Sequence, residues 1–206
     1  MIAIVDYSVG NLFSLKSSFA AIGVEVSVTA DPDELAAADG IVLPGVGAFE
    51  DAADKLRVTG LDQTLITLAK AGKPLLGICL GMQMLFEKSY EYGEHRGLGL
   101  IAGNVDYIGK SVPGGLKIPH IGWNELSFEQ HPLFKYIRQG DCVYFVHSYA
   151  GVQCPDVIAT TEYGATLTAA VAKGNVMGCQ FHPEKSGKVG LAILRAFSEM
   201  KEGQIC

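Results

Sequence analysis

Residues 74–86 read Pro-Leu-Leu-Gly-Ile-Cys-Leu-Gly-Met-Gln-Met-Leu-Phe, the most apolar part of the chain. Its apolar first half predicts a buried strand, and its second half predicts a helix that runs to about Lys88. Cys79 lies at the junction, with Gly77 two residues before it and Gly81 two residues after it. Small residues at these positions permit the tight strand–turn–helix connection that lifts a nucleophile out of a sheet edge.

The residues before this stretch repeat the same alternation of strand and helix. The predicted strands are 2–5, 24–29, 40–43 and 74–78, and the predicted helices are 11–22, a short one after the Asp31-Pro-Asp-Glu34 capping box, and 48–71 with a break near Gly60. Strands that alternate with helices in this way form a parallel sheet that is covered on both faces.

After about residue 100 strands follow one another with little helix between them. The predicted strands are 101–108, 117–128, 142–149, 157–163, 167–173 and 176–181, the last two joined by the hairpin signal Gly174-Asn175. A final helix, capped by Ser186, directs Val189, Ile193, Leu194 and Phe197 inward. We therefore expect one α/β domain over 1–206: an open, mostly parallel sheet with helices on both faces and antiparallel additions in the C-terminal half.

The composition excludes several classes of protein. Of the 206 residues, 49% are hydrophobic and 18% charged, which excludes a disordered chain. Sixteen Lys and Arg against 22 Asp and Glu give a net charge of −6, which argues against a nucleic-acid partner. No apolar run reaches the ~18–20 residues of a membrane span, and the N-terminus lacks the pattern of a signal peptide. The five scattered cysteines form no C-x-x-C pair, so we expect a cytoplasmic protein with neither a metal nor a cofactor.

Cys79 is the candidate nucleophile. The N-terminus of the following helix favours its thiolate, and the backbone N–H of Leu80 points to where an oxyanion would form. The alternative is that Cys79 is a small buried apolar residue.

The segment Gln180-Phe-His-Pro-Glu184 offers a base and a group to orient it. A nucleophilic thiol needs a base within hydrogen-bond reach, and that base needs an acceptor that holds it. His182 and Glu184 stand two apart at a strand's end, so their side chains project the same way if the chain stays extended. The alternative is a surface histidine beside a solvated glutamate.

Pro44-Gly-Val-Gly47 follows another predicted strand. Two glycines let the backbone approach a ligand closely and present an N–H group. The segment is not a dinucleotide fingerprint, because Glu50 occupies the place of the third glycine. An ordinary turn is the alternative.

All three segments fall at the carboxyl ends of predicted strands, where open α/β sheets bind ligands. The residues alone therefore predict a cysteine-dependent acyl transferase or hydrolase. Gln83, one helical turn after Cys79, would lie beside the thiol and suggests a polar substrate.

These motifs resemble those of the class I, or triad, glutamine amidotransferases. The matching segments are Pro44–Gly47, Gly77–Gln83 and His182–Glu184, in the family's order and spacing. Further motifs are most similar to those of the glutaminase subunits of imidazole glycerol phosphate synthase: Asp6-Tyr7 with Gly10-Asn11, Gly122-Trp-Asn124, Tyr144–Tyr149, Thr160–Tyr163 and His182–Ser186. The resemblance covers essentially the whole chain, and Ser8-Val9 is a small departure from it.

The resemblance implies a flavodoxin-like core and a Cys79–His182–Glu184 triad that hydrolyses L-glutamine to glutamate and ammonia through a γ-glutamyl thioester. It implies that the backbone N–H groups of Leu80 and Val46 hold the oxyanion. The implied glutamine-binding residues are Gly47, Gln83, Glu91, Ser148 and Tyr149. Helical spacing from Gln83 nominates Glu87 in place of Glu91, and we follow the resemblance, which requires the helix to end before Glu91.

The resemblance also implies a partner, a (β/α)₈-barrel cyclase that uses the ammonia to make imidazole glycerol phosphate and AICAR in histidine biosynthesis. The implied interface residues are Asn11, Trp123, Tyr144 and Lys185. From the residues alone, Trp123 and Tyr144 are equally readable as core aromatics, Asn11 as a helix cap and Lys185 as a solvated charge.

Three other functions stay open. They are another triad glutaminase, such as the one that feeds pyridoxal phosphate synthase, a non-catalytic binding module on the same sheet, and a cysteine peptidase or esterase-like hydrolase. We expect the remaining histidines to be structural or exposed, in turns or loops, and the remaining cysteines to be inert; these residues are His95, His120, His131, Cys142, Cys154, Cys179 and Cys206.

Overall fold

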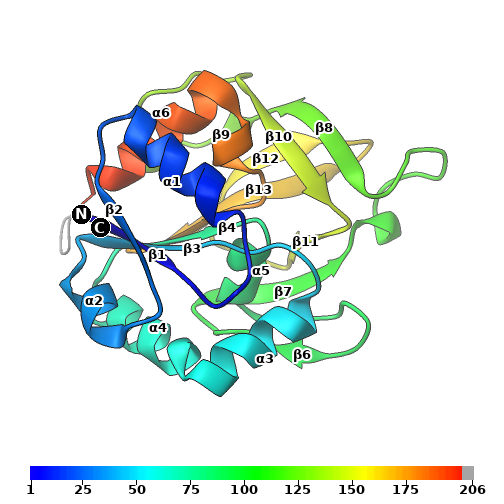
Figure 1. The fold of residues 1–206 in the computed structure, drawn as a ribbon. Coiled ribbons are helices and arrows are strands. Elements are labelled where there is room, and N and C mark those ends of the chain that lie inside the picture. The colour runs from blue at the N-terminus through cyan, green and yellow to red at the C-terminus, as the bar shows by residue number, and fades with distance from the viewer. Residues whose placement is uncertain (201–206) are drawn as a thin grey trace.

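A central sheet of eight strands organises the computed structural model, which describes residues 1–200 (Figure 1). In order across the sheet the strands are β2 (Val26–Thr29), β1 (Ile2–Val5), β3 (Gly40–Leu43), β4 (Leu75–Ile78), β14 (Val176–Cys179), β13 (Thr166–Lys173), β12 (Val157–Glu162) and β9 (Ser127–Phe128). The first five run parallel, and β13, β12 and β9 add antiparallel pairs. The predicted fold class is confirmed.

Helices cover both faces of this sheet. They are α1 (Leu12–Ala21), α2 (Pro32–Ala37), α3 (Phe49–Thr59), α4 (Leu61–Lys70), α5 (Leu80–Leu85) and α6 (Gly187–Ser198). Figure 1 shows α1 and α6 on one face and α2, α3 and α4 on the other. Strand β1 divides its side chains accordingly, because Ile2 and Ile4 join the core under α1 and α6 while Ala3 and Val5 join the opposite core. No helix within residues 1–200 has the length and apolar character needed to span a bilayer.

Two smaller sheets extend the C-terminal half. One pairs β8 (His120–Glu125) with β10 (Cys142–His147), and the other has the order β11 (Tyr149–Val152), β7 (Ile101–Tyr107), β5 (Phe86–Ser89), β6 (His95–Arg96). Short 3₁₀ turns are η1 (Ile108–Lys110), η2 (Pro132–Phe134) and η3 (Pro183–Lys185). The hairpin predicted at Gly174-Asn175 is confirmed, since β13 and β14 pair antiparallel across it.

The helix expected to reach Lys88 ends at Leu85, and that prediction is wrong in its length. Residues 86–89 leave the helix because they pair as β5 with β7 and β6. Tertiary pairing has overridden a helical pattern whose apolar face continues into Phe86. The expectation that the helix ends before Glu91 is confirmed.

Two predicted caps differ in detail. Asp31 caps α2 by accepting from the Asp33 N–H at 2.8 Å, but Glu34 accepts from the Ser27 hydroxyl at 3.1 Å and so serves the neighbouring strand instead of a capping box. Ser186 stands at the N-cap of α6 without a side-chain capping bond. The break near Gly60 is confirmed by its left-handed backbone, with φ of 73°.

Gly81 has no room for a side chain, because a Cβ there would collide with the carbonyl oxygen of Leu43. Gly→Ala normally stabilises a helix by roughly 0.5–1 kcal/mol. We expect the opposite sign for Gly81→Ala, a loss of about 2–4 kcal/mol in the free energy of unfolding measured with urea. Gly114→Ala is the control, since no atom lies within 4 Å of its added Cβ, and equal stability of the two variants would contradict the prediction.

Candidate active site

Cys79 occupies a strained turn between β4 and α5. Its backbone has φ of 54° and ψ of −111°, and its N–H donates to the Cys179 carbonyl on the adjacent strand β14 at 2.8 Å. Neither Gly77 nor Gly81 would accept a Cβ: one on Gly77 would lie 2.5 Å from the Gly81 carbonyl oxygen, and one on Gly81 would collide with the Leu43 carbonyl oxygen. A non-glycine residue held at positive φ by such packing stores strain of about 1–3 kcal/mol, a common property of functional positions. The expected strand–turn–helix connection at Cys79, here called the elbow, is confirmed.

His182 and Glu184 form a buried pair beside this elbow. His182 Nδ1 lies 2.8 Å from Glu184 Oε1, and both side chains are 2% exposed. The contact does not arise from extended chain, as the sequence analysis expects, because Pro183 begins the 3₁₀ turn η3 and curls Glu184 back onto the ring. The alternative of a surface histidine beside a solvated glutamate is excluded by this burial.

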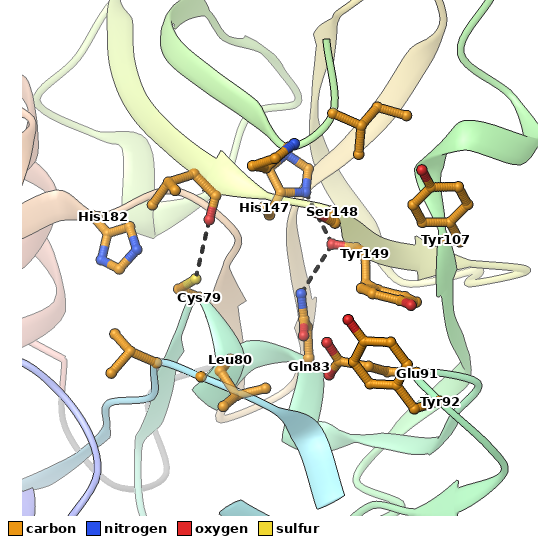
Figure 2. Close-up of a pocket in the computed structure, with 15 residues that line it drawn as sticks. Cys79, Leu80, Gln83, Glu91, Tyr92, Tyr107, His147, Ser148, Tyr149 and His182 are labelled. Atoms are coloured by element: carbon orange, nitrogen blue, oxygen red, sulfur yellow. Dashed lines mark hydrogen bonds between the residues drawn. The ribbon is translucent and has the colours of Figure 1, made fainter.

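The other ring nitrogen of His182 faces the sulfur. Figure 2 shows the imidazole beside Cys79, and Nε2 is buried with no hydrogen bond formed among the described residues. Catalytic hydrogen bonds commonly tighten only once substrate is bound. Burial lowers the pKa of His182, but interactions with the Cys79 thiol and the Glu184 carboxylate outweigh it and raise that pKa to about 9. The arrangement suits proton transfer from sulfur to nitrogen.

Main-chain bonds hold His182 in place from strand β10. The His182 N–H donates to the Tyr144 carbonyl at 2.9 Å, and the Tyr144 N–H donates to the Ser186 hydroxyl oxygen at 3.0 Å. The Ser186 hydroxyl in turn donates to the His182 carbonyl at 2.6 Å. The three bonds close a ring, which explains why Ser186 does not cap α6.

The loop after β3 is fixed at its start and open at its end. The buried Tyr7 hydroxyl donates to the Pro44 carbonyl at 2.7 Å, and burial raises the pKa of Tyr7 above its ordinary value. Gly45 lies against the first turn of α5, where a Cβ would meet the Gly81 nitrogen. Val46 is 44% exposed, and Gly47 has φ of 93°. The loop is therefore packed at Pro44 and Gly45 and exposed at Val46.

A cavity of about 510 Å³ opens beside Cys79 (Figure 2). Of the residues expected at the site, it is lined by Val46, Gly47, Cys79, Leu80, Gln83, Glu91, Ser148, Tyr149 and His182. Three segments distant in sequence thus meet at the carboxyl ends of β3, β4 and β14. Among the expected catalytic, oxyanion and substrate residues, Glu184 alone is not part of the lining, because it lies behind the imidazole.

Gln83 and Glu91 face this cavity, whereas Glu87 does not. Glu91 Oε2 accepts the Phe49 N–H at 2.7 Å, and burial raises the pKa of Glu91 although that bond opposes the shift. Glu87 accepts the Gly103 N–H at 3.1 Å, outside the cavity lining. Strand β5 breaks the helical spacing that nominates Glu87. Both N–H groups of Gln83 are engaged, since its Nε2 lies 2.9 Å from the Tyr149 carbonyl and 3.0 Å from Gln180 Oε1.

Several lining residues escape the sequence analysis. They are Tyr92, Tyr107, Ile118, Pro119, Val146 and His147. The rings of Tyr92 and Tyr107 lie 6.4 and 5.6 Å from that of Tyr149 and form an aromatic wall next to Glu91. Tyr107 lies next to the end of the predicted strand 101–108 and His147 lies inside a quoted motif, so position alone could have nominated these two.

Gln180 is the other residue that sequence reasoning missed. Its side chain is 0% exposed, and its Nε2 lies 3.7 Å from Cys79 Sγ. Only its place two residues before His182 could have indicated it.

A chain of side-chain hydrogen bonds extends from the cavity wall to strand β8. His147 Nδ1 lies 2.9 Å from the Tyr149 carbonyl, His147 Nε2 lies 3.0 Å from His120 Nδ1, and His120 Nε2 lies 2.8 Å from Asn124 Oδ1. Asn124 Nδ2 donates to the Glu162 carbonyl at 2.9 Å, which fixes its amide orientation. His120 is therefore structural, as expected, but it lies on a strand and not in a turn.

The four contacts in this chain need three ring protons, whereas two neutral imidazoles carry one each. Complete pairing thus requires one imidazolium. Burial opposes that charge: it is the largest influence on both rings, lowering the pKa of His147 to about 4 and also lowering that of His120. All the hydrogen bonds from Tyr149 through His147 and His120 to Asn124 are therefore formed only at acidic pH, where one ring is protonated.

An aromatic face lies on the two-stranded sheet of β8 and β10. Trp123 is 56% exposed, and its ring centroid lies 6.0 Å from that of its cross-strand partner Tyr144. Lys185 Nζ lies 5.9 Å from the Tyr144 ring centroid. Trp123 is therefore no core aromatic. Asn11 does cap α1, accepting the Ser14 N–H at 3.3 Å.

The side chains of Cys142, Cys154, Cys179, His95 and His131 do not line the cavity beside Cys79. Within residues 1–200 the cysteines at 79, 142, 154 and 179 are free thiols, and Cys206 lies outside the described residues. His131 Nδ1 accepts the Leu133 N–H at 3.2 Å, and His95 lies 3.6 Å from Glu50. No group of three His, Cys, Asp or Glu side chains in that range could hold a metal ion.

Fold and pocket together define a class of α/β proteins with a cysteine elbow and a His–Glu pair at one sheet edge. The family model described as glutamine amidotransferase class-I matches residues 3–199, and the chain belongs to that family. A solved structure titled "Crystal structure of glutamine amidotransferase" has the same fold, with a TM-score of 0.75 over 96% of this chain and 97% of that one at 19% identity. The structure of PurLQS from Thermotoga maritima gives a TM-score of 0.73 over 95% and 96%, at 21% identity.

Curated relatives narrow the family. Imidazole glycerol phosphate synthase subunit HisH of Lacticaseibacillus casei (strain BL23) is 48% identical over 205 residues, 99% of this chain and 98% of that protein. The subunit of the same name from Caldanaerobacter subterraneus subsp. tengcongensis is 48% identical over 203 residues, covering 97% and 98%. Within the class I amidotransferases, this chain is a member of the HisH family.

Burial of His147 predicts acid sensitivity of the fold. Its pKa is about 4 in the folded chain and about 6.5 when unfolded, so below pH 6.5 the unfolded state binds a proton that the folded state does not. Stability is therefore lost as pH falls, by about 1.6 kcal/mol between pH 6.5 and 5 from this residue. Urea unfolding of His147→Asn, whose amide can still donate to the Tyr149 carbonyl, should show a correspondingly smaller loss over this range. An unchanged pH dependence would contradict the assignment.

Proposed function

We propose that this chain hydrolyses L-glutamine to glutamate and ammonia through Cys79, His182 and Glu184. The observation that carries the proposal is the buried His182 ring, which lies between the Glu184 carboxylate and the Cys79 thiol at the edge of the cavity. A thiol, a base and an acceptor that orients the base are what nucleophilic acyl transfer needs. The family and its HisH members support glutamine as the substrate.

In the proposed reaction the Cys79 proton passes to His182 Nε2, and the sulfur attacks the side-chain carbonyl carbon of glutamine. The carbonyl oxygen becomes an oxyanion that the N–H groups of Leu80 and Val46 hold, the first helical N–H being without a partner inside its helix. His182 then protonates the amide nitrogen and the C–N bond breaks. Ammonia departs, and a γ-glutamyl thioester on Cys79 remains. Water attacks the thioester while His182 takes its proton, which releases glutamate and restores the thiol.

The remaining cavity residues are proposed to hold the amino-acid end of glutamine. Glu91 would pair with the α-ammonium group, next to the tyrosine wall. Gln83 would offer its side-chain carbonyl oxygen, because its N–H groups already donate to the Tyr149 carbonyl and to Gln180 Oε1. Gly47, Ser148 and Tyr149 also line the cavity and would complete the contacts.

We propose that the ammonia passes directly to a (β/α)₈-barrel cyclase bound as a heterodimer in the cytoplasm. Ammonia released to water would be protonated and lost as a nucleophile, so a glutaminase of this kind needs an acceptor at its site. The cyclase would act as a lyase that makes imidazole glycerol phosphate and AICAR in histidine biosynthesis. The relatives' name, a subunit of imidazole glycerol phosphate synthase, supports this partner.

The isolated chain is proposed to be nearly inactive. Tyr7 fixes the start of the oxyanion loop while Val46 stays exposed, so the Val46 N–H is oriented only when the partner and its ligand stabilise the loop. Loss of one oxyanion donor costs roughly 10²–10³ in rate. Activation on assembly should be of that order.

Glutamate release, assayed with and without the cyclase and its nucleotide ligand, tests the reaction. We expect Cys79→Ser to abolish release and Glu184→Gln to lower kcat by about 10²–10⁴-fold, because the imidazole loses its orienting charge. Cys142→Ser, which alters an exposed thiol, should be unaffected. Full turnover by the chain alone would refute the activation proposal, and release by Cys79→Ser would refute the triad.

Three further measurements separate the competing functions. A glutamine-analogue electrophile should label Cys79 in a working site and leave a non-catalytic module unlabelled. Turnover of peptides or esters in place of glutamine would indicate a peptidase-like hydrolase. Pull-down with each candidate synthase distinguishes the cyclase from the pyridoxal phosphate system.

Trp123 should contribute to cyclase binding, because a large exposed aromatic ring loses much water-accessible area on docking. Trp123→Ala is expected to raise the dissociation constant for the cyclase by roughly 10–100-fold, measured by calorimetry. The free energy of unfolding should change by no more than ~0.5 kcal/mol. Val58→Ala, an 88% exposed side chain on α3, is the matched control. Equal affinities of both variants would contradict the interface assignment.

A further inference from the structure

Gln180 is a buried amide that touches the reactive sulfur. It follows the last residue of β14, its side chain is fully buried, and its Nε2 lies 3.7 Å from Cys79 Sγ. Its backbone N–H is bonded to the Ala169 carbonyl at 2.8 Å, which anchors it to strand β13. The mechanism described above gives this residue no part.

The orientation of the amide follows from its neighbours. The Tyr149 carbonyl can only accept, so the Gln83 atom 2.9 Å from it is the amide nitrogen. The same nitrogen lies 3.0 Å from Gln180, so the Gln180 atom facing it is the oxygen. The amide nitrogen of Gln180 must then point at the sulfur. A fixed backbone carbonyl thus determines, through two amides, that Cys79 faces a donor.

We propose that Gln180 is a further catalytic residue, one that donates a hydrogen bond to the Cys79 thiolate. When the Cys79 proton moves to His182 Nε2, the negative charge on sulfur strengthens this bond, because charge-assisted hydrogen bonds are roughly twice as strong as neutral ones. The bond weakens again when sulfur attacks the carbonyl carbon and its charge passes to the oxyanion. Gln180 therefore favours formation of the thiolate and fixes its direction relative to His182.

This proposal deepens the proposed function and rests on it, yet the two can fail separately. The test is the pH dependence of the rate at which iodoacetamide alkylates Cys79, followed by peptide mass spectrometry. Alkylation reports the thiolate and needs no glutamine, cyclase or oxyanion loop. A chain that alkylates as expected but releases no glutamate would refute the glutaminase proposal alone.

Gln180→Met keeps the length of the side chain and removes the donor. We expect its alkylation profile to move about one pH unit higher. Since a more basic thiolate is also a better nucleophile, with a Brønsted slope near 0.5, alkylation should be about threefold slower at low pH and about threefold faster at high pH. A residue that only packs the wall would not make the two rate curves cross.

Gln63→Met is the matched control, because Gln63 is exposed and its Nε2 donates to the neighbouring Asp62 carboxylate at the surface. Its profile should superimpose on that of the unmodified chain. A profile of Gln180→Met that also superimposes would overturn the proposal.

A second measurement covers the case in which Gln180→Met does not fold. In the unmodified chain, the side-chain ¹⁵N–¹H signals of Gln180 should shift with pH along the alkylation profile, and Cys79→Ala should abolish that shift. Signals that do not respond to pH, or that respond equally in Cys79→Ala, would overturn the proposal without any change at Gln180.

Discussion

The parallel pairing of β4 with β14 is the constraint on which the site depends. These strands are separated by about a hundred residues of chain, yet Ile78 and Cys179 stand side by side in register. The Cys79 N–H continues the ladder by one further bond to the Cys179 carbonyl. Parallel neighbours end at the same edge of a sheet, so the chain that leaves β4 as the elbow meets the chain that leaves β14 as Gln180, Phe181 and His182.

Close backbone packing at glycines makes this edge rigid. Gly45, Gly77 and Gly81 come from a loop, a strand and a helix, and a Cβ on any of them would collide with neighbouring backbone: Gly81 for the first two, and Leu43 for Gly81 itself. Close packing of this kind over-determines the turn at Cys79 and keeps it at positive φ. Main-chain contacts therefore fix the backbone from which the sulfur projects.

The elements that the sequence predicts well are those set by local periodicity and turn chemistry. The parallel strands, the hairpin at Gly174 and the Asp31 cap need no knowledge of the rest of the chain. The errors come from interactions across the fold. Phe86 leaves its helix because a distant strand pairs with it, and Glu184 reaches its histidine through a 3₁₀ turn that two-residue spacing does not predict.

The same limit applies to the site. Motifs place the nucleophile and base at one sheet edge, but the partners that orient buried amides and imidazoles lie far away in sequence. The donor–acceptor chain from Asn124 through two histidines to the cavity wall depends on strand register between β8 and β10. Gln180 likewise gains its meaning only from the amide that faces it. Such contacts leave no periodic signal.

Tyr144 belongs to two neighbourhoods at once, through different atoms. Its carbonyl and N–H hold the chain around His182, while its ring lies beside the exposed Trp123 on the β8–β10 sheet. Every amino acid except proline has the same backbone donor and acceptor. Replacing the Tyr144 side chain therefore leaves its backbone bonds to His182 and Ser186 intact. Substitutions at position 144 can therefore change the binding surface of the β8–β10 sheet without changing the backbone bonds that hold His182.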